Sequence, residues 1–144
     1  MTTPRPRIAA VDYGTRRVGL AVTDPLRLFA QPLGTFSPGE AVERLKQLRD
    51  GDGLETVVLG WPLTEAGEEG PATRRVEPFF GRLRNALPGV AVVKHDERFT
   101  SRRAAEALVQ AGVRKKARRE KGRLDAVAAT LILQDYLEEV GSGT

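Results

Sequence analysis

Acidic side chains at three separate places in the sequence are the candidates for chemistry: Asp12, the pair Asp96 and Glu97, and Asp125. An acid at the end of a buried apolar strand loses hydration, so it needs either hydrogen-bond donors or a metal ion as a partner. Both partners remain open for Asp12, because its carboxylate can also accept hydrogen bonds from the backbone amides of the following turn. Asp125 can equally complement the dipole of a helix.

Two groups of basic residues accompany these acids. Thr15, Arg16 and Arg17 form a compact basic turn shortly after Asp12, and the segment 114–123 is the most basic part of the chain. A charge run is usually a solvated surface, but this one directly precedes Asp125 and can hold phosphates near it. The formal net charge of +4 also favours a polyanionic partner.

The composition excludes several classes of protein. The chain has no cysteine, so disulfides, thiolate zinc sites and a cysteine nucleophile are excluded. No apolar stretch approaches the length of a membrane span, and the start of the chain does not resemble a signal peptide. We therefore expect one cytoplasmic domain over residues 1–144 without a membrane partner, with flexible tails at 1–6 and 141–144. His95 is the only histidine, and the sequence assigns it no role.

The elements that must position these residues follow from the apolar pattern. Residues 7–15 predict a central strand that carries Asp12, 18–23 a strand returning beside it, and 28–36 an edge strand, because it contains Pro32. Ser37 and Glu40 predict a capped helix start. The rest of the pattern predicts a strand at 54–60, a loop at 61–70, a helix interrupted by Pro78, a strand at 89–94, a helix from Thr100 to Gly112, a mobile loop at 114–123 and a helix at 124–139.

Asp96 and Glu97 cannot both face Asp12, because successive strand residues point to opposite faces of a sheet. One of the two is therefore the functional candidate. The order of elements, with three strands in a meander before any helix, predicts an α/β fold of the ribonuclease H-like class. Its mixed sheet has five strands, an antiparallel meander plus two parallel strands, and is flanked by helices.

Four segments of the chain resemble the YqgF or RuvX family of Holliday junction resolvases and ribosomal-RNA-processing nucleases: 12–19, 60–63, 96–101 and 125–137. The resemblance covers nearly the whole chain. It implies that Asp12, Glu97 and Asp125 converge as the catalytic carboxylates and hold Mg²⁺ or Mn²⁺. Such ions neutralise the phosphodiester, activate water and stabilise the leaving oxygen.

The resulting hypothesis is a metal-dependent endonuclease that acts on structured nucleic acid, either the precursor of 16S rRNA at its 5′ end or a four-way DNA junction. A symmetric junction cut requires a homodimer. The expected substrate contacts are basic or polar side chains: Thr15, Arg16, Arg17, Arg98, Lys115, Lys116, Arg118 and Arg119.

Two alternatives stay open. Asp12-Tyr13-Gly14-Thr15 also resembles the phosphate loop of ATP-binding phosphotransferases of the actin and sugar-kinase class, although those proteins contain two such domains. The other alternative is a nucleic-acid-binding protein without catalytic activity.

Overall fold

The computed structural model describes residues 5–14, 16–97 and 121–142, with the backbone alone at 121–125 and 141–142. Its sheet contains β1 (Arg7–Tyr13), β2 (Val18–Thr23), β3 (Ala30–Phe36), β4 (Leu54–Trp61) and β5 (Ala91–Asp96), in the order β3-β2-β1-β4-β5. The β1–β2 and β2–β3 pairs are antiparallel, whereas β1–β4 and β4–β5 are parallel. The predicted ribonuclease H-like mixed sheet is therefore confirmed, with the Pro32 strand at the edge.

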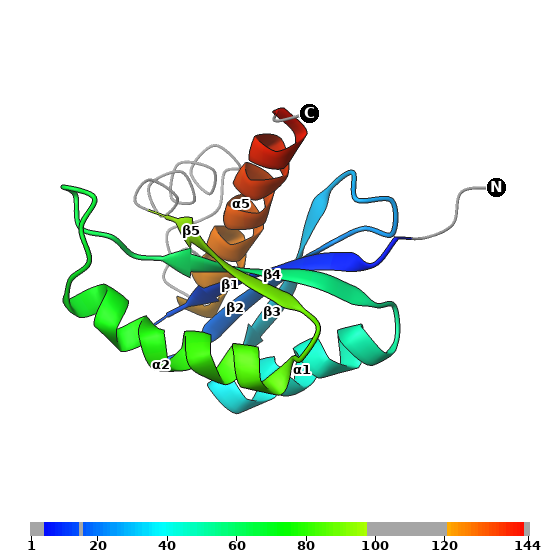
Figure 1. Ribbon diagram of the computed structural model, residues 1–144, viewed down its shortest axis with the longest axis horizontal. Helices are drawn as coiled ribbons and strands as arrows, with labels where there is room; N and C mark the ends of the chain where they lie inside the picture. The colour runs from blue at the N-terminus through cyan, green and yellow to red at the C-terminus, as the bar shows by residue number, and fades with distance from the viewer. Residues whose placement is uncertain (1–4, 15, 98–120, 143–144) are drawn as a thin grey trace.

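Helices cover the two faces of this sheet (Figure 1). Helices α1 (Pro38–Asp50) and α2 (Pro71–Ala86) lie on one face, and α5 (Lys121–Ser142) crosses the other. Each face has its own apolar core. Under α5 the core consists of Ile8, Ala10, Ala21, Val58, Ala129, Ile132 and Leu133.

Alternation along β1 decides which residues meet which helix. Ala9 and Val11 belong to the core under α1 and α2, whereas Ile8 and Ala10 belong to the core under α5. Ile132 and Leu133 of α5 are fully buried, and each burial of this kind contributes about 1.5–3 kcal/mol. This packing fixes α5 across the sheet face toward which even-numbered β1 residues point.

The local sequence rules for α1 are confirmed in atomic detail. Ser37 is the N-cap: its Oγ accepts a hydrogen bond from the Glu40 backbone N–H at 3.2 Å, and the Glu40 carboxylate accepts one from the Ser37 N–H at 3.0 Å. Its buried residues are Ala41, Val42, Leu45 and Leu48. The helix ends at Gly51, which is its C-cap.

Several element boundaries differ from the predictions. Helix α2 begins at Pro71, directly after the loop predicted at 61–70, but it continues through Pro78. Helix α5 extends beyond 124–139 at both ends. Arg5 and Pro6, expected in a tail, are hydrogen-bonded to Pro25 and Arg27. The predicted helix at 100–112 and the basic loop up to residue 120 lie outside the described residues.

No helix in the described part of the chain is both long and apolar enough to span a membrane.

Candidate active site

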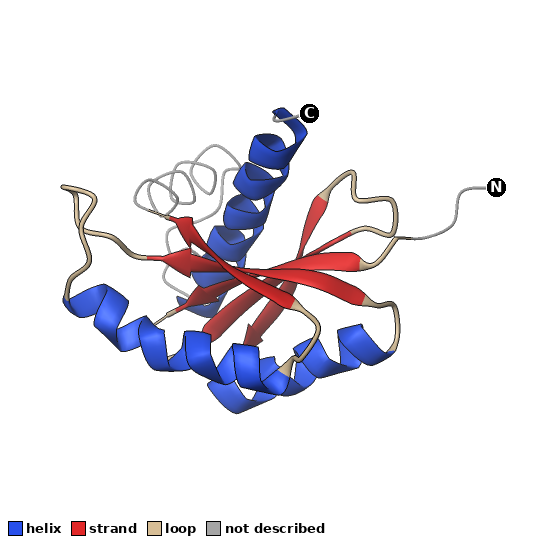
Figure 2. Cartoon of the chain, in the orientation of Figure 1, coloured by secondary structure: helices blue, strands red, loops and turns tan. Residues whose placement is uncertain are grey.

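The strands that carry the candidate acids end at one edge of the sheet. β1, β4 and β5 are mutually parallel neighbours, so their carboxyl ends lie together, as Figure 2 shows. Ligands of open α/β sheets bind at such an edge. Asp12 is the penultimate residue of β1, and Glu97 directly follows β5.

Asp12 and Glu97 point to the face covered by α5. Alternate residues of a strand point to the same face. Asp12 therefore faces the same way as Ile8 and Ala10, and Glu97 the same way as Val93, which packs on the same core. Asp96 has the opposite parity and belongs with Lys94 on the α2 side. The requirement that only one of the two adjacent acids faces Asp12 is met, and the one that does is Glu97.

Gly60 of β4 makes room for the Glu97 carboxylate between β1 and β5. A Cβ atom at residue 60 would lie 3.1 Å from Glu97 Cδ and 2.8 Å from Ile132 Cδ1, and closer still to Glu97 Oε2. Real Cβ atoms do not approach heavy atoms this closely. The Glu97 carboxylate therefore rests against bare backbone beneath α5, and no residue other than glycine leaves that space.

A hydrogen bond joins the side chains of Asp12 and Glu97. Burial raises the pKa of Glu97, and the nearby Asp96 charge raises it further, while the Asp12 hydrogen bond and the Arg75 charge act in the opposite direction. The net result is a pKa above the ordinary value of 4.5. A hydrogen bond between two carboxyl groups needs a proton on one of them, and when both are ionised a cation must offset their repulsion. The pair therefore has the charge and the donor atoms for a hard divalent ion.

The strand that ends in Glu97 is anchored through Trp61. The Glu97 backbone N–H donates to the Trp61 carbonyl at 3.3 Å, which extends the β4–β5 pairing by one residue. On the opposite face, Lys94 Nζ lies 4.1 Å from the Trp61 ring centroid and 4.9 Å from that of Phe80. These contacts hold β5 against α2 just before the catalytic candidate.

Asp125, the third expected carboxylate, belongs to α5 and precedes Ala129 by four residues. Ala129 is fully buried against the sheet. The Asp125 side chain lies outside the described ones. Among the described side chains, no group of three or more potential metal ligands is found.

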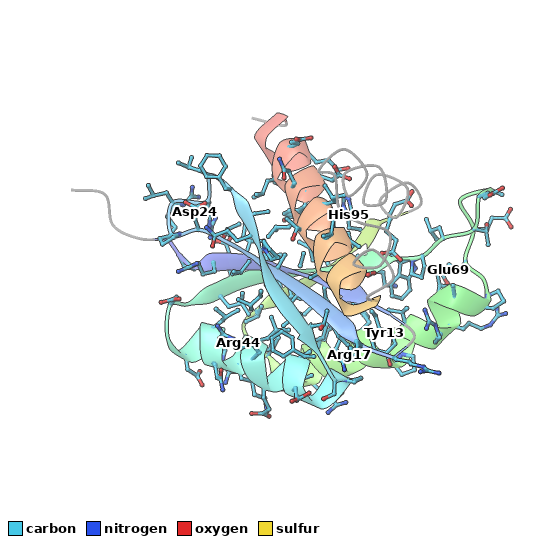
Figure 3. All side chains as sticks on the ribbon, turned by 180° about the vertical axis from the view of Figure 1, so that it is seen from behind. Tyr13, Arg17, Asp24, Arg44, Glu69 and His95 are labelled. Carbon is cyan, nitrogen blue, oxygen red and sulfur yellow. The ribbon has the colours of Figure 1, made fainter. Side chains whose placement is uncertain are left out.

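The predicted substrate contacts divide into two sets. Arg16 and Arg17 are exposed in the turn between β1 and β2, where the Gly14 N–H donates to the Arg17 carbonyl at 3.0 Å. Figure 3 shows Arg17 at the same end of the sheet as Tyr13, far from Asp24 at the opposite end. The second set lies outside the described residues: Thr15, Arg98, Lys115, Lys116, Arg118 and Arg119.

Arg75 of α2 was not expected at this site. Its guanidinium lies 5.9 Å from the centroid of the Tyr13 ring, and its charge reaches Glu97. The same ring packs on Phe79, one turn further along α2, at 4.7 Å between centroids. In the sequence pattern Arg75 is one more exposed residue of a helix, so nothing in the sequence distinguishes it as a residue of the site.

His95 is a buried residue on the α5 face. Its Nδ1 lies 3.7 Å from Glu139 Oε2 of α5, so it links β5 to the covering helix. Figure 3 shows it behind α5, on the strand that leads to Glu97. This position agrees with a structural residue that supports β5.

The sheet order, with α5 across one face and a carboxylate pair at the carboxyl ends of β1 and β5, defines a ribonuclease H-like domain. Among solved structures, RuvC of Thermus thermophilus in complex with a Holliday junction substrate has the same fold. Its TM-score is 0.58 at 19% sequence identity, with 96% of this chain and 98% of that chain covered. A second T. thermophilus RuvC structure gives a TM-score of 0.53 at 21% identity.

The family model of RuvX, described as Holliday junction resolvase, matches residues 6–139, and the chain belongs to this family. Its relatives include a protein of Salinibacter ruber, 52% identical over 135 residues, with 94% of each chain covered. Another, from Chlorobaculum tepidum, is 47% identical over 132 residues, covering 92% of this chain and 93% of the relative. Both relatives carry the name "Putative pre-16S rRNA nuclease".

Proposed function

We propose that this protein is a divalent-metal-dependent endonuclease that cleaves phosphodiesters in structured nucleic acid. The observation that carries the proposal is the hydrogen-bonded pair of Asp12 and Glu97 at the carboxyl ends of two parallel strands. Membership of the RuvX family and the names of the relatives support the activity.

The proposed metal ligands are Asp12, Glu97 and Asp125. Burial makes two adjacent carboxylates costly when both are ionised, and a bound Mg²⁺ or Mn²⁺ offsets that cost. When bound, the ion supplies electrostatic stabilisation of the phosphate and lowers the pKa of water. The protein's own part is positional: the missing side chain at Gly60 leaves room for the Glu97 carboxylate, which is hydrogen-bonded to Asp12.

The proposed substrates are those that the family and its members name. One is a precursor of 16S rRNA, processed at the 5′ end, and the other is a four-way DNA junction. Arg16 and Arg17 follow Asp12 closely in the sequence and are exposed, which suits contact with a phosphate backbone. For the junction, we further propose a homodimer, because two strands must be cut symmetrically. We place the activity in the cytoplasm, the compartment of both substrates in a bacterium.

A parallel assay of both substrates tests this function. The purified protein is incubated with end-labelled precursor rRNA and with a four-way junction, in Mg²⁺, in Mn²⁺ and in EDTA. We expect metal-dependent cleavage of one substrate at defined positions, with none in EDTA. Cleavage of neither substrate, together with saturable binding, would assign the protein to the non-catalytic alternative. Saturable ATP binding at micromolar concentration would revive the phosphotransferase hypothesis.

A further inference from the structure

We infer that Arg75 is a substrate-binding residue that holds a backbone phosphate of the nucleic acid beside the Asp12–Glu97 pair. The inference rests on the proposed function and deepens it, because it identifies a phosphate site on α2 that the sequence did not indicate. Two observations support it: the contact of Arg75 with the ring of Tyr13, the residue next to Asp12, and the exposure of the Arg75 side chain.

The Tyr13 ring orients the Arg75 guanidinium. Tyr13 immediately follows Asp12 but points to the α2 face, where its ring also packs against Phe79. Arg75 and Phe79 are four residues apart, so they lie on the same side of α2 and flank one ring. An arginine stacked on an aromatic ring loses part of its conformational freedom before any ligand arrives.

The Arg75 guanidinium lies at the edge of the sheet where β1 ends. The ring that it contacts belongs to Tyr13, which is next to Asp12 at the carboxyl end of β1. Among the described residues, Arg75 forms no ion pair within 4.0 Å, and its side chain is exposed. Within that part of the chain, no ion pair therefore occupies the guanidinium, and it can bind a ligand at the edge of the site.

A phosphate is the ligand that this arrangement suits. A polyanionic backbone that approaches two half-buried acids is repelled unless a cation lies next to them. The planar guanidinium can bind two phosphate oxygens at once, whereas a lysine ammonium offers only a point charge. Arg75, together with Arg16 and Arg17 across the end of β1, would place the strand to be cut at Asp12.

The test is a binding experiment that does not depend on cleavage. Affinities for the precursor rRNA and the four-way junction are measured by fluorescence anisotropy in EDTA over a salt series, in the Asp12→Asn background. Arg84→Ala is the matched control, because Arg84 lies on the same helix with its guanidinium 5.7 Å from the Phe80 ring. Circular dichroism and the unfolding midpoint establish that each variant is folded.

We expect Arg75→Ala to weaken binding roughly tenfold and to reduce the slope of log affinity against log salt by about 0.7–0.9. Arg75→Lys should keep that slope but recover only part of the affinity, because the paired donors are lost. In the Asp12-containing enzyme, Arg75→Ala should raise KM more than it lowers kcat. Arg84→Ala should leave affinity and slope unchanged.

A failure of this inference can be distinguished from a failure of the proposed function. Folded Arg75→Ala with unchanged affinity and slope would overturn this inference and leave the proposed nuclease intact. An equal loss in Arg84→Ala would also overturn it, since it would show a general effect of positive charge on α2. If the protein binds neither nucleic acid, the proposed function falls and this inference falls with it.

Discussion

Replacing Gly60 by alanine tests whether the position of the Glu97 carboxylate over residue 60 matters for function. The added Cβ would lie 3.1 Å from Glu97 Cδ and 2.8 Å from Ile132 Cδ1. Ile132 is fully buried between α5 and the sheet, so it has little room to withdraw. Glu97 ends a strand and is half-buried, so its carboxylate is the group that must move.

The size of the effect follows from these distances. An ordinary carbon contact is about 3.5–4.0 Å, so the carboxylate has to shift by roughly 0.5–1 Å. A displacement of about 1 Å in a catalytic group costs on the order of 100-fold in rate. Overpacking against Ile132 costs about 1–3 kcal/mol of stability if the helix does not move. We therefore expect a folded, weakened protein with about 100-fold lower kcat.

The assay compares Gly60→Ala with Gly81→Ala. A Cβ at residue 81 of α2 meets no atom within 4 Å, so that variant should be active and about 0.5–1 kcal/mol more stable. Urea unfolding gives the stability, and single-turnover cleavage in Mn²⁺ separates chemistry from binding. Wild-type kcat in a folded Gly60→Ala protein would refute the reasoning. It would mean that the Glu97 carboxylate does not lie over Gly60 during cleavage.

Three further predictions follow from the site. Glu97→Gln should abolish cleavage while Asp96→Asn retains most of it, because only Glu97 faces Asp12; the reverse result in a metal-dependent cleavage assay would show that the wrong acid was chosen. Because the pKa of Glu97 is raised in the folded protein, its contribution to stability is fully present below the unfolded pKa of 4.5 and is lost as the pH rises through the folded pKa. At neutral pH in EDTA, Glu97→Gln should therefore be more stable than the wild type. Urea unfolding over a pH series measures this difference, and a less stable Gln variant at neutral pH would contradict the assigned cause. Finally, alanine substitution of four of the basic residues in the 114–123 segment, Lys115, Lys116, Arg118 and Arg119, should weaken binding with kcat preserved. The slope of log affinity against log salt should fall by roughly 0.7–0.9 per lost contact, and an unchanged slope would show that the segment is only a solvated surface.

The strand pattern was predictable because its signals are local. The apolar runs, Pro32 at a sheet edge and the Ser37–Glu40 capping box each follow from short-range chemistry, and each is confirmed. Element ends were less predictable. The sequence predicts a helix interrupted by Pro78, whereas α2 begins at Pro71, a suitable residue for a first helical turn, and continues through Pro78.

The site was only partly predictable. Period-two alternation required that one of Asp96 and Glu97 face away from Asp12, but the choice of Glu97 depended on the family resemblance. The bare backbone of Gly60 beneath Glu97 and the contact of Arg75 with Tyr13 arise from tertiary packing between separate elements. No spacing along the chain encodes them, so both became visible only in the folded structure.

The most direct test of the central claim is the separation of cleavage from binding in Asp12→Asn. The amide keeps the size of the side chain and removes the charge that a metal ion requires. Cleavage and anisotropy are measured side by side on precursor rRNA and on the four-way junction in Mn²⁺, for the wild type and this variant. We expect the variant to bind with near wild-type affinity and to cleave neither substrate. Cleavage by Asp12→Asn at the wild-type rate would contradict a nuclease built on the Asp12–Glu97 pair.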